Sequence, residues 1–299
     1  MKPATLMTTL AFGLTAAILL ACNPNRGKNG NSGEPSTVTV DRGQQQGIPY
    51  RLSSGQKINL PDELLEISGI TFIEGEDDHI YAIQDEQGLL FTYNLTTQKA
   101  TYTPFGKDGD YEDIASSKTH LFILKSNGTI YSFPISEKDN IKAVTEQKDL
   151  VPKGEYEGLF VDKSTNQAYV LCKECKADKK QPQTSGYIFT IGPDGGLSPQ
   201  GEFAVQLDEL KKFDPKIKKT FRPSALAKKL DSNEWYILSS VDKALVVTDD
   251  HFHVKSVTTL DPKLFPQPEG ITFDSKFNLY ISSEAGSQDN GIIYKFEKI

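Results

Sequence analysis

The sequence predicts an all-β protein whose main body is a β-propeller. Apolar and polar residues alternate in short runs that Gly, Asn and Asp separate, and sustained 3.6-residue periodicity is scarce. A set of strands also recurs about every 45 residues, which is the spacing of four-stranded propeller blades. We therefore expect one repeat domain over residues 48–299.

The first 21 residues have the pattern of a secretory signal peptide. Lys2 supplies a positive charge, and residues 6–21 form an apolar run broken only by small residues and threonines. The run is shorter than the ~20 apolar residues of a typical membrane-spanning helix. Residues 19–22, Leu-Leu-Ala-Cys, resemble the lipobox of bacterial lipoprotein precursors, which implies cleavage before Cys22 and acylation of its thiol. We therefore expect Cys22 to anchor the chain to a lipid bilayer of the cell envelope, outside the cytoplasm, with the outer membrane as the expected location.

Residues 22–47 are predicted to be the lipidated cysteine and a flexible tether. This stretch is rich in Asn, Gly, Ser, Pro and Gln and has hardly any large apolar residue to bury. Loss of Lys2 with the signal peptide takes the formal charge from −7 to −8. A mildly acidic chain without a long basic stripe argues against nucleic acid as a partner.

The first strand of each repeat broadly follows one form: a small or aromatic residue, an acid, a small residue, then Ile or Leu. Successive copies begin 44, 45, 67 and 45 residues apart. The five copies are Ile67–Ile70, Tyr111–Ile114, Tyr156–Leu159, Pro223–Leu226 and Pro268–Ile271.

Each first strand is followed by three more in a constant order. The second strands are centred on the aromatic residues Tyr81, Phe122, Tyr169, Tyr236 and Tyr280. The third strands start at Gly88, Gly128, Gly186, Lys243 and Gly291, where glycine allows the positive φ of a tight hairpin. Weaker, more polar fourth strands are expected at residues 99–104, 141–148, 200–205 and 253–260.

The fifth repeat ends without a fourth strand, and residues 50–60 form an unassigned strand-like stretch before the first repeat. Pairing the two closes the ring and hides its open edge. We therefore predict five blades, with six as the alternative if the 67-residue interval holds another. The excess is interpreted as a loop over residues 172–185 and a short amphipathic helix over residues 207–213.

The motifs Pro-Glu-Gly-Ile-Thr-Phe-Asp at residues 268–274 and Asn-Leu-Tyr-Ile-Ser-Ser-Glu at residues 278–284 complete the pattern. With the rest of residues 48–299, they resemble the SdiA-regulated family of exported β-propellers. Lactonase, phytase-like esterase and NHL-type propellers carry a related strand pair. The resemblance implies the fold and the compartment, and it implies no reaction.

The candidate functional surface is an acidic face at one end of the propeller. An antiparallel sheet places the start of its first strand beside the end of its second, so acids at both positions meet there. The candidate ligand-binding residues of this face are Glu66, Asp85, Glu112, Glu157, Arg222, Glu269 and Glu284.

Glu112, Glu157 and Glu269 are the candidate ligands of a divalent cation, with Glu284 as a further one. Crowded carboxylates are best tolerated when a cation or a basic side chain neutralises them, and hard oxygen ligands suit calcium. The favoured alternative is structural: the acids accept hydrogen bonds between blades, and Lys125, Lys173 and Arg222 form ion pairs with them.

The leading functional hypothesis is a non-catalytic module that binds a small ligand, a glycan or an envelope protein through the acidic face. The alternative is a divalent-cation-dependent esterase or lactonase that uses the same acids. The sequence has no Gly-x-Ser-x-Gly nucleophile motif, which argues against serine hydrolase chemistry.

Three other features have structural interpretations. Cys172 and Cys175 are expected to form a disulfide, because they are an even pair in an exported chain and lack the context of redox or zinc motifs. The repeated tyrosines and Trp235 are expected to pack between blades instead of forming a carbohydrate-stacking platform. The lysines at 211, 212, 216, 218 and 219 are interpreted as a solvated face, with contact to anionic lipid or glycan as the alternative.

Overall fold

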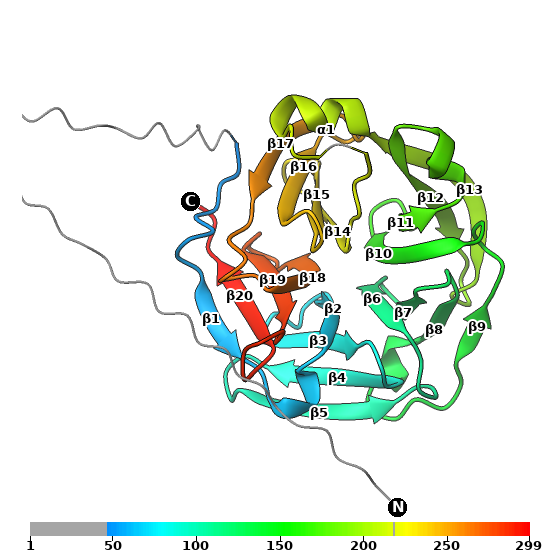
Figure 1. Ribbon diagram of the computed structural model, residues 1–299. Coiled ribbons are helices and arrows are strands. Elements are labelled where there is room, and N and C mark those ends of the chain that lie inside the picture. Colours follow the sequence, from blue (N-terminus) through cyan, green and yellow to red (C-terminus); the bar gives the residue numbers. More distant parts are fainter. Residues whose placement is uncertain (1–46, 218) are drawn as a thin grey trace, which may run out of the picture. The chain divides into compact units, whose positions relative to one another are not determined.

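Each sheet of the described residues is antiparallel and has four strands. The computed structural model describes residues 47–217 and 219–299, and five such sheets form a five-bladed β-propeller (Figure 1). The prediction of five blades is confirmed, and the six-bladed alternative is wrong. The predicted signal peptide, Cys22 and all of the tether except Gly47 lie outside the described residues.

Each blade runs from an inner strand to an outer strand. Blade 1 contains β2–β5, at Ile67–Thr71, His79–Gln84, Leu89–Asn94 and Lys99–Pro104. Blade 2 contains β6–β9, at Tyr111–Ser116, His120–Lys125, Ile130–Pro134 and Thr145–Gln147. Blade 3 contains β10–β13, at Gly154–Asp162, Gln167–Cys175, Gln183–Ile191 and Leu197–Gln206. Blade 4 contains β14–β17, at Ala225–Lys229, Glu234–Ser239, Ala244–Thr248 and Val254–Thr259.

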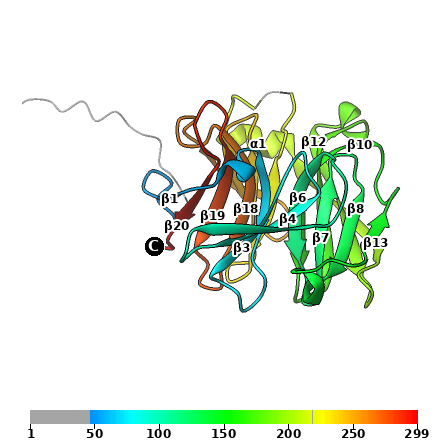
Figure 2. The same ribbon diagram turned by 90° about the horizontal axis from the view of Figure 1, so that it is seen from below.

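Blade 5 is built from both ends of the described chain. It combines β18, β19 and β20, at Gln267–Phe273, Leu279–Glu284 and Ile292–Phe296, with β1 at Gln56–Asn59. The register pairs Gln56 with Lys295 and Asn59 with Ile292. The predicted closure of the ring by an N-terminal strand is therefore confirmed. Seen side-on, the strands run between two opposite faces of the disc (Figure 2).

The aromatic residue of each second strand packs against the next blade. The Tyr236 ring meets Phe273 of blade 5 edge-on, with 5.1 Å between ring centroids. Tyr280 of blade 5 meets Phe72 of blade 1 in the same way at 5.0 Å. Tyr169 of blade 3 lies 4.6 Å from Trp235 of blade 4, which is also buried. These side chains belong to the core between blades, as the sequence predicts.

The glycines that precede the third strands do not all have the predicted role. Gly128 has a positive φ of 83°, but Lys243 adopts a φ of 50° at the equivalent place without being glycine. Gly186 and Gly291 are instead required by close packing: a Cβ would lie 2.1 Å from the Phe203 ring or from the Leu64 carbonyl oxygen, respectively. The prediction of positive φ is therefore wrong at these two glycines and at Gly88.

The long interval in blade 3 contains extra strand length as well as a helix. The loop predicted at residues 172–185 is wrong in part, because β11 continues to Cys175 and β12 already begins at Gln183. The predicted helix is present as α1, Leu207–Phe213, and it buries Leu207 and Leu210. No helix in the described parts of the chain has the length and hydropathy to cross a bilayer.

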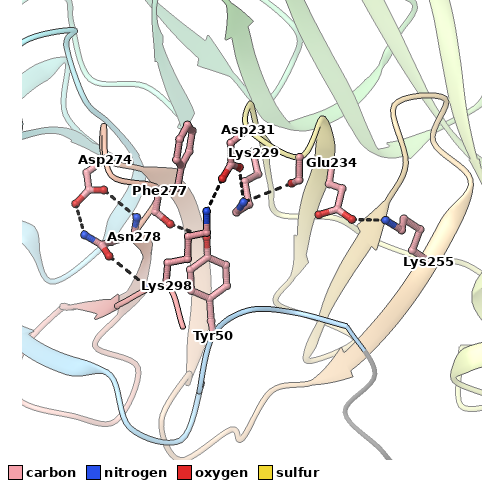
Figure 3. A network of polar contacts seen from close by, with 10 residues as sticks. Tyr50, Lys229, Asp231, Glu234, Lys255, Asp274, Phe277, Asn278 and Lys298 are labelled. Atoms are coloured by element: carbon pink, nitrogen blue, oxygen red, sulfur yellow. Dashed lines mark hydrogen bonds and ion pairs between the residues drawn. The ribbon is translucent and has the colours of Figure 1, made fainter.

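A polar network ties both chain ends to blades 4 and 5 (Figure 3). The Tyr50 hydroxyl donates to the Phe277 carbonyl at 2.6 Å. The Lys298 ammonium donates to Asp231 Oδ2 at 2.6 Å, and the buried Lys229 ammonium donates to Asp231 Oδ1. Asp231, in the turn between β14 and β15, therefore joins the C-terminal segment to blade 4.

Candidate functional site

The predicted acids lie where the inner strands begin, at one end of the ring. The five inner strands β2, β6, β10, β14 and β18 contact their neighbours around the centre (Figure 1). Glu112 lies in β6, Glu157 in β10 and Glu269 in β18, while Glu284 ends β19, Glu66 precedes β2 and Asp85 follows β3. We call these six residues the acidic face.

Glu157 is the most buried carboxylate of the acidic face, with 6% of its surface exposed. Its Oε1 accepts a hydrogen bond from the Lys173 ammonium in β11. Its Oε2 is buried and has no hydrogen-bond partner among the described residues. A buried polar atom without a partner costs about 1–3 kcal/mol, so a donor from a ligand would be favourable at this oxygen.

Burial and mutual repulsion keep these acids partly protonated near neutral pH. Burial raises the pKa of Glu157 to about 7, with Lys173 partly offsetting the effect. Burial, with added repulsion from Glu157, raises the pKa of Glu269 to about 8 and that of Glu112 to about 9. At neutral pH the acidic face therefore carries less negative charge than six ionised carboxylates would. A cation that approaches it favours the ionised form of the acids, so they release protons.

Glu284 forms a second part of the acidic face. Burial, with added repulsion from Glu269, Glu66 and Asp85, raises the pKa of Glu284 to about 8. The Gln267 amide donates to Glu284. Burial also raises the pKa of Asp85, whose Oδ1 is a second buried oxygen without a partner among the described residues. Two unpartnered carboxylate oxygens thus belong to one face.

Arg222 lies at the rim and pairs with Glu174, which is not one of the six residues of the acidic face. Its guanidinium is 3.4 Å from Glu174 Oε2, and both side chains are close to half exposed. Glu174 follows Lys173 in β11. Lys173 therefore contacts Glu157 within the acidic face, and Arg222 forms a more solvated pair beside it.

Small residues bring the inner strands close together just beyond the acids. A Cβ on Gly69 would come within 2.6 Å of the Asp113 Cα atom, and one on Gly270 within 2.6 Å of the Ser68 carbonyl oxygen. The Asp113 carboxylate, at the small-residue position of blade 2, accepts hydrogen bonds from the amides of Ile114 and Leu159. The small third residue of the sequence motif therefore serves this close packing.

Cys172 and Cys175 are joined by a disulfide, as predicted from their compartment and number. The bond encloses Lys173 and Glu174, so it fixes the segment that supplies both ion pairs. The sulfur atoms also lie near Asp178, in a cluster whose potential ligand atoms are all within 4.8 Å of one another. Because both sulfurs are in the disulfide, this cluster lacks thiolates for a metal.

The predicted calcium ligands Glu112, Glu157 and Glu269 do not form such a compact set. Within residues 47–217 and 219–299, the Cys172 cluster is the only group of three ligand-type residues at that spacing. Calcium oxygens lie about 2.3–2.6 Å from the ion, so the three carboxylates would have to move to hold it.

Sequence reasoning missed two side chains that act on Glu269. The Ser240 side chain and the charge of Lys243 both lower the pKa of Glu269 and so partly offset the effect of burial. Burial lowers the pKa of Lys243 itself. Lys243 replaces the glycine found before the other third strands, and this departure from the repeat was a signal that could have identified it.

The fold and the site define a class: a five-bladed, closed β-propeller with a cluster of half-buried acids at one end. No family model and no curated protein matches the chain.

Solved structures share the fold at low sequence identity. A luciferin-regenerating enzyme has a TM-score of 0.51 and 10% identity, over 81% of this chain and 95% of that chain. A nidogen/laminin complex has a TM-score of 0.47 and 15% identity, over 73% and 72% of the two chains. Virginiamycin B lyase from Staphylococcus aureus has a TM-score of 0.42 and 16% identity, over 82% and 74%. Of these likenesses, the one to the luciferin-regenerating enzyme supports the propeller fold, and the fold alone.

Proposed function

We propose that the protein is a ligand-binding module of the cell envelope, anchored through an acylated Cys22, and that its acidic face binds a small organic cation. The observation that carries the proposal is the buried Glu157 Oε2, which has no hydrogen-bond partner among the described residues. An ammonium or guanidinium group would donate to this oxygen and neutralise the surrounding acids. The carboxylates are not gathered within 4.8 Å of one another, which argues against a preformed metal site.

Binding to spermidine, as a probe of organic cations, tests the proposal. Isothermal titration calorimetry of the full-length protein in detergent should show binding at pH 8. Glu157→Gln should weaken it about tenfold or more, the effect of losing one charge-assisted hydrogen bond. Glu155→Gln is the matched control, because Glu155 lies in the same strand but is exposed. Equal binding by both variants, or none by the wild type, would reject the proposal.

Calcium is titrated in the same way to test the predicted cation site. Calcium binding that competes with spermidine and is lost in Glu157→Gln would replace the organic cation with a metal ion as the ligand. A rise in melting temperature with calcium, reversed by a chelator, would accompany such binding.

A cation-dependent esterase or lactonase is the second candidate. The pKa of Glu157, raised by burial to about 7, favours it, because a carboxyl that titrates near neutrality can transfer protons. Hydrolysis of 4-nitrophenyl acetate and of γ-lactones would be followed with and without calcium. Activity that depends on calcium and disappears in Glu157→Gln, but not in Glu155→Gln, would establish this candidate.

A further inference from the structure

The opposite end of the propeller contains a cavity that the acidic face does not use. Its volume is about 430 Å³, within the ~300–1,000 Å³ range of small-molecule sites. The C-terminal ends of all five inner strands or the residues after them line it, including Ile114, Leu159, Leu226 and Ile271. The close-packed glycines Gly69, Gly158 and Gly270 precede these lining residues in their strands, so the cavity lies beyond them from the acids.

The walls of the cavity are mainly apolar and part of them faces water. Phe160 and Phe273 line it and are only partly buried. Leu230, at the same opening, is 48% exposed and is one of the few large exposed hydrophobic residues of the described chain. Exposed apolar surface around a concave site is a feature of ligand-binding grooves.

Most charged groups at the cavity already have partners. Asp274 accepts hydrogen bonds from the Asn278 amide and side chain at 2.8 Å each (Figure 3). Asp77 accepts from the Ser275 amide at 3.2 Å. The Lys228 ammonium is 2.7 Å from Asp250.

Lys163, Lys118 and Glu74 are the charged residues that remain, and Lys118 and Glu74 are exposed. Lys163 is partly buried, and its ammonium forms no ion pair within 4.0 Å in the described ranges. Burial lowers the pKa of Lys163, while the more distant Glu74 partly offsets this. The Lys163 ammonium is therefore partly desolvated and has no close counter-charge, so an anionic group of a ligand would stabilise it.

We propose that this cavity binds an amphipathic carboxylate, with its apolar chain among the ends of the inner strands and its carboxylate on Lys163. Shape and charge support this choice together. The apolar walls remove hydrocarbon from water, and Lys163 places one positive charge at the opening. Because the cavity and the acidic face occupy opposite ends of the strands, this binding is independent of the ligand proposed for Glu157.

Decanoate is the probe, with decyltrimethylammonium as the cationic counterpart of similar chain length. Titration calorimetry of the full-length protein at pH 7.5 should show decanoate binding to the wild type. Lys163→Met keeps the aliphatic stem and should weaken decanoate about 10- to 100-fold, the loss of one charge-assisted contact. The same variant should bind decyltrimethylammonium no more weakly than the wild type does.

Two further variants locate the site. Lys276→Met is the matched control: Lys276 is exposed in the adjoining turn, outside the cavity lining, and its loss should leave decanoate affinity unchanged. Thr272→Trp should fill the cavity and weaken both probes, with melting curves used to check folding. Decanoate binding that is absent in the wild type, or unaffected by Lys163→Met or by a folded Thr272→Trp variant, would overturn the proposal.

Discussion

The Glu112 carboxyl is half-buried beside Glu157 and Asp110, and these surroundings make its protonation part of the folding equilibrium. Burial raises the pKa of Glu112 from 4.5 to about 9 in the folded chain. Between these two values the folded protein holds a proton that the unfolded chain has released. Stability should therefore fall as pH rises through this interval.

Glu112→Gln should remove the contribution of Glu112 to the pH dependence of stability. At pH 9 we expect the variant to be more stable than the wild type by about 1–3 kcal/mol, the cost of an ill-satisfied buried polar group. At pH 4 the two should be equal, because Glu112 is then protonated in both states. Urea unfolding at the two pH values measures the difference. A stability gain that is the same at both would contradict the role given to ionisation.

At the residue scale, the sequence predicted which acids and which candidate cations lie at one end of the propeller, but not which acid each cation contacts. Repeat position is enough to place Glu157 and Glu269 at the start of inner strands. Partner choice depends on how far a long side chain reaches: Lys173 contacts Glu157, whereas Arg222 pairs with Glu174. That choice depends on the shape of the rim, which local patterns do not encode.

A second stability prediction concerns Asp231, in the turn between β14 and β15, which accepts hydrogen bonds from both Lys229 and Lys298. Burial tends to raise the pKa of Asp231, but hydrogen bonds from Lys229 and Lys298 outweigh it and lower the pKa. The Lys229 side chain is 3% exposed, so Asp231→Asn leaves a buried ammonium without its counter-charge. We expect a loss of about 3 kcal/mol in unfolding free energy at pH 7.

Lys298→Met is the control, because it removes only the exposed member of the same network and should cost about 0–1 kcal/mol. The effect of Asp231→Asn should shrink below about pH 4, where the unfolded aspartate protonates, and vanish as the pH falls through the lower folded pKa. Guanidinium unfolding from pH 7 to pH 2 checks both expectations. Equal losses in the two variants would show that burial of Lys229 is unimportant.

At the element scale, most strands and the helix could be located from the sequence. The predictions were wrong where contacts between distant segments determine where a strand begins or ends. The fourth strand predicted at residues 141–148 is only Thr145–Gln147, because a polar edge strand has few contacts that define its ends. Conversely, β11 and β12 extend into the predicted loop, where β11 pairs with β10, β12 pairs with β13, and the disulfide joins Cys172 to Cys175. The glycines before the third strands could not be interpreted correctly for the same reason, because the atoms that crowd them belong to segments distant in the sequence.

For the whole molecule, the ring predicts that damage to one blade interface affects all blades. Ile58 of β1 is 7% exposed and packs in the core shared by blades 5 and 1. Ile58→Ala should lower the unfolding free energy by about 2–4 kcal/mol. Trp235, the single tryptophan of the chain, lies against blade 3 and reports from another part of the ring.

Thermal unfolding of the Ile58→Ala variant, followed by Trp235 fluorescence and by circular dichroism, measures this coupling. Both signals should shift to the same lower temperature, because the blades unfold together. A fluorescence transition at the wild-type temperature, with only the dichroism changed, would mean that the blades melt separately. Ring closure and a count of five blades could be predicted from the repeats, but the 67-residue interval left six blades open until the sheets themselves were seen.

The pairing of β1 with β20 also sets the order of events during synthesis. Gln56 is made near the beginning of the chain, and its partner Lys295 is four residues from the end. Synthesis proceeds from the N-terminus to the C-terminus, so β1 stays unpaired until four blades and most of the fifth have been made. A chain released before β20 had been made would leave β1 and β19 with unpaired edges, which are ready templates for aggregation.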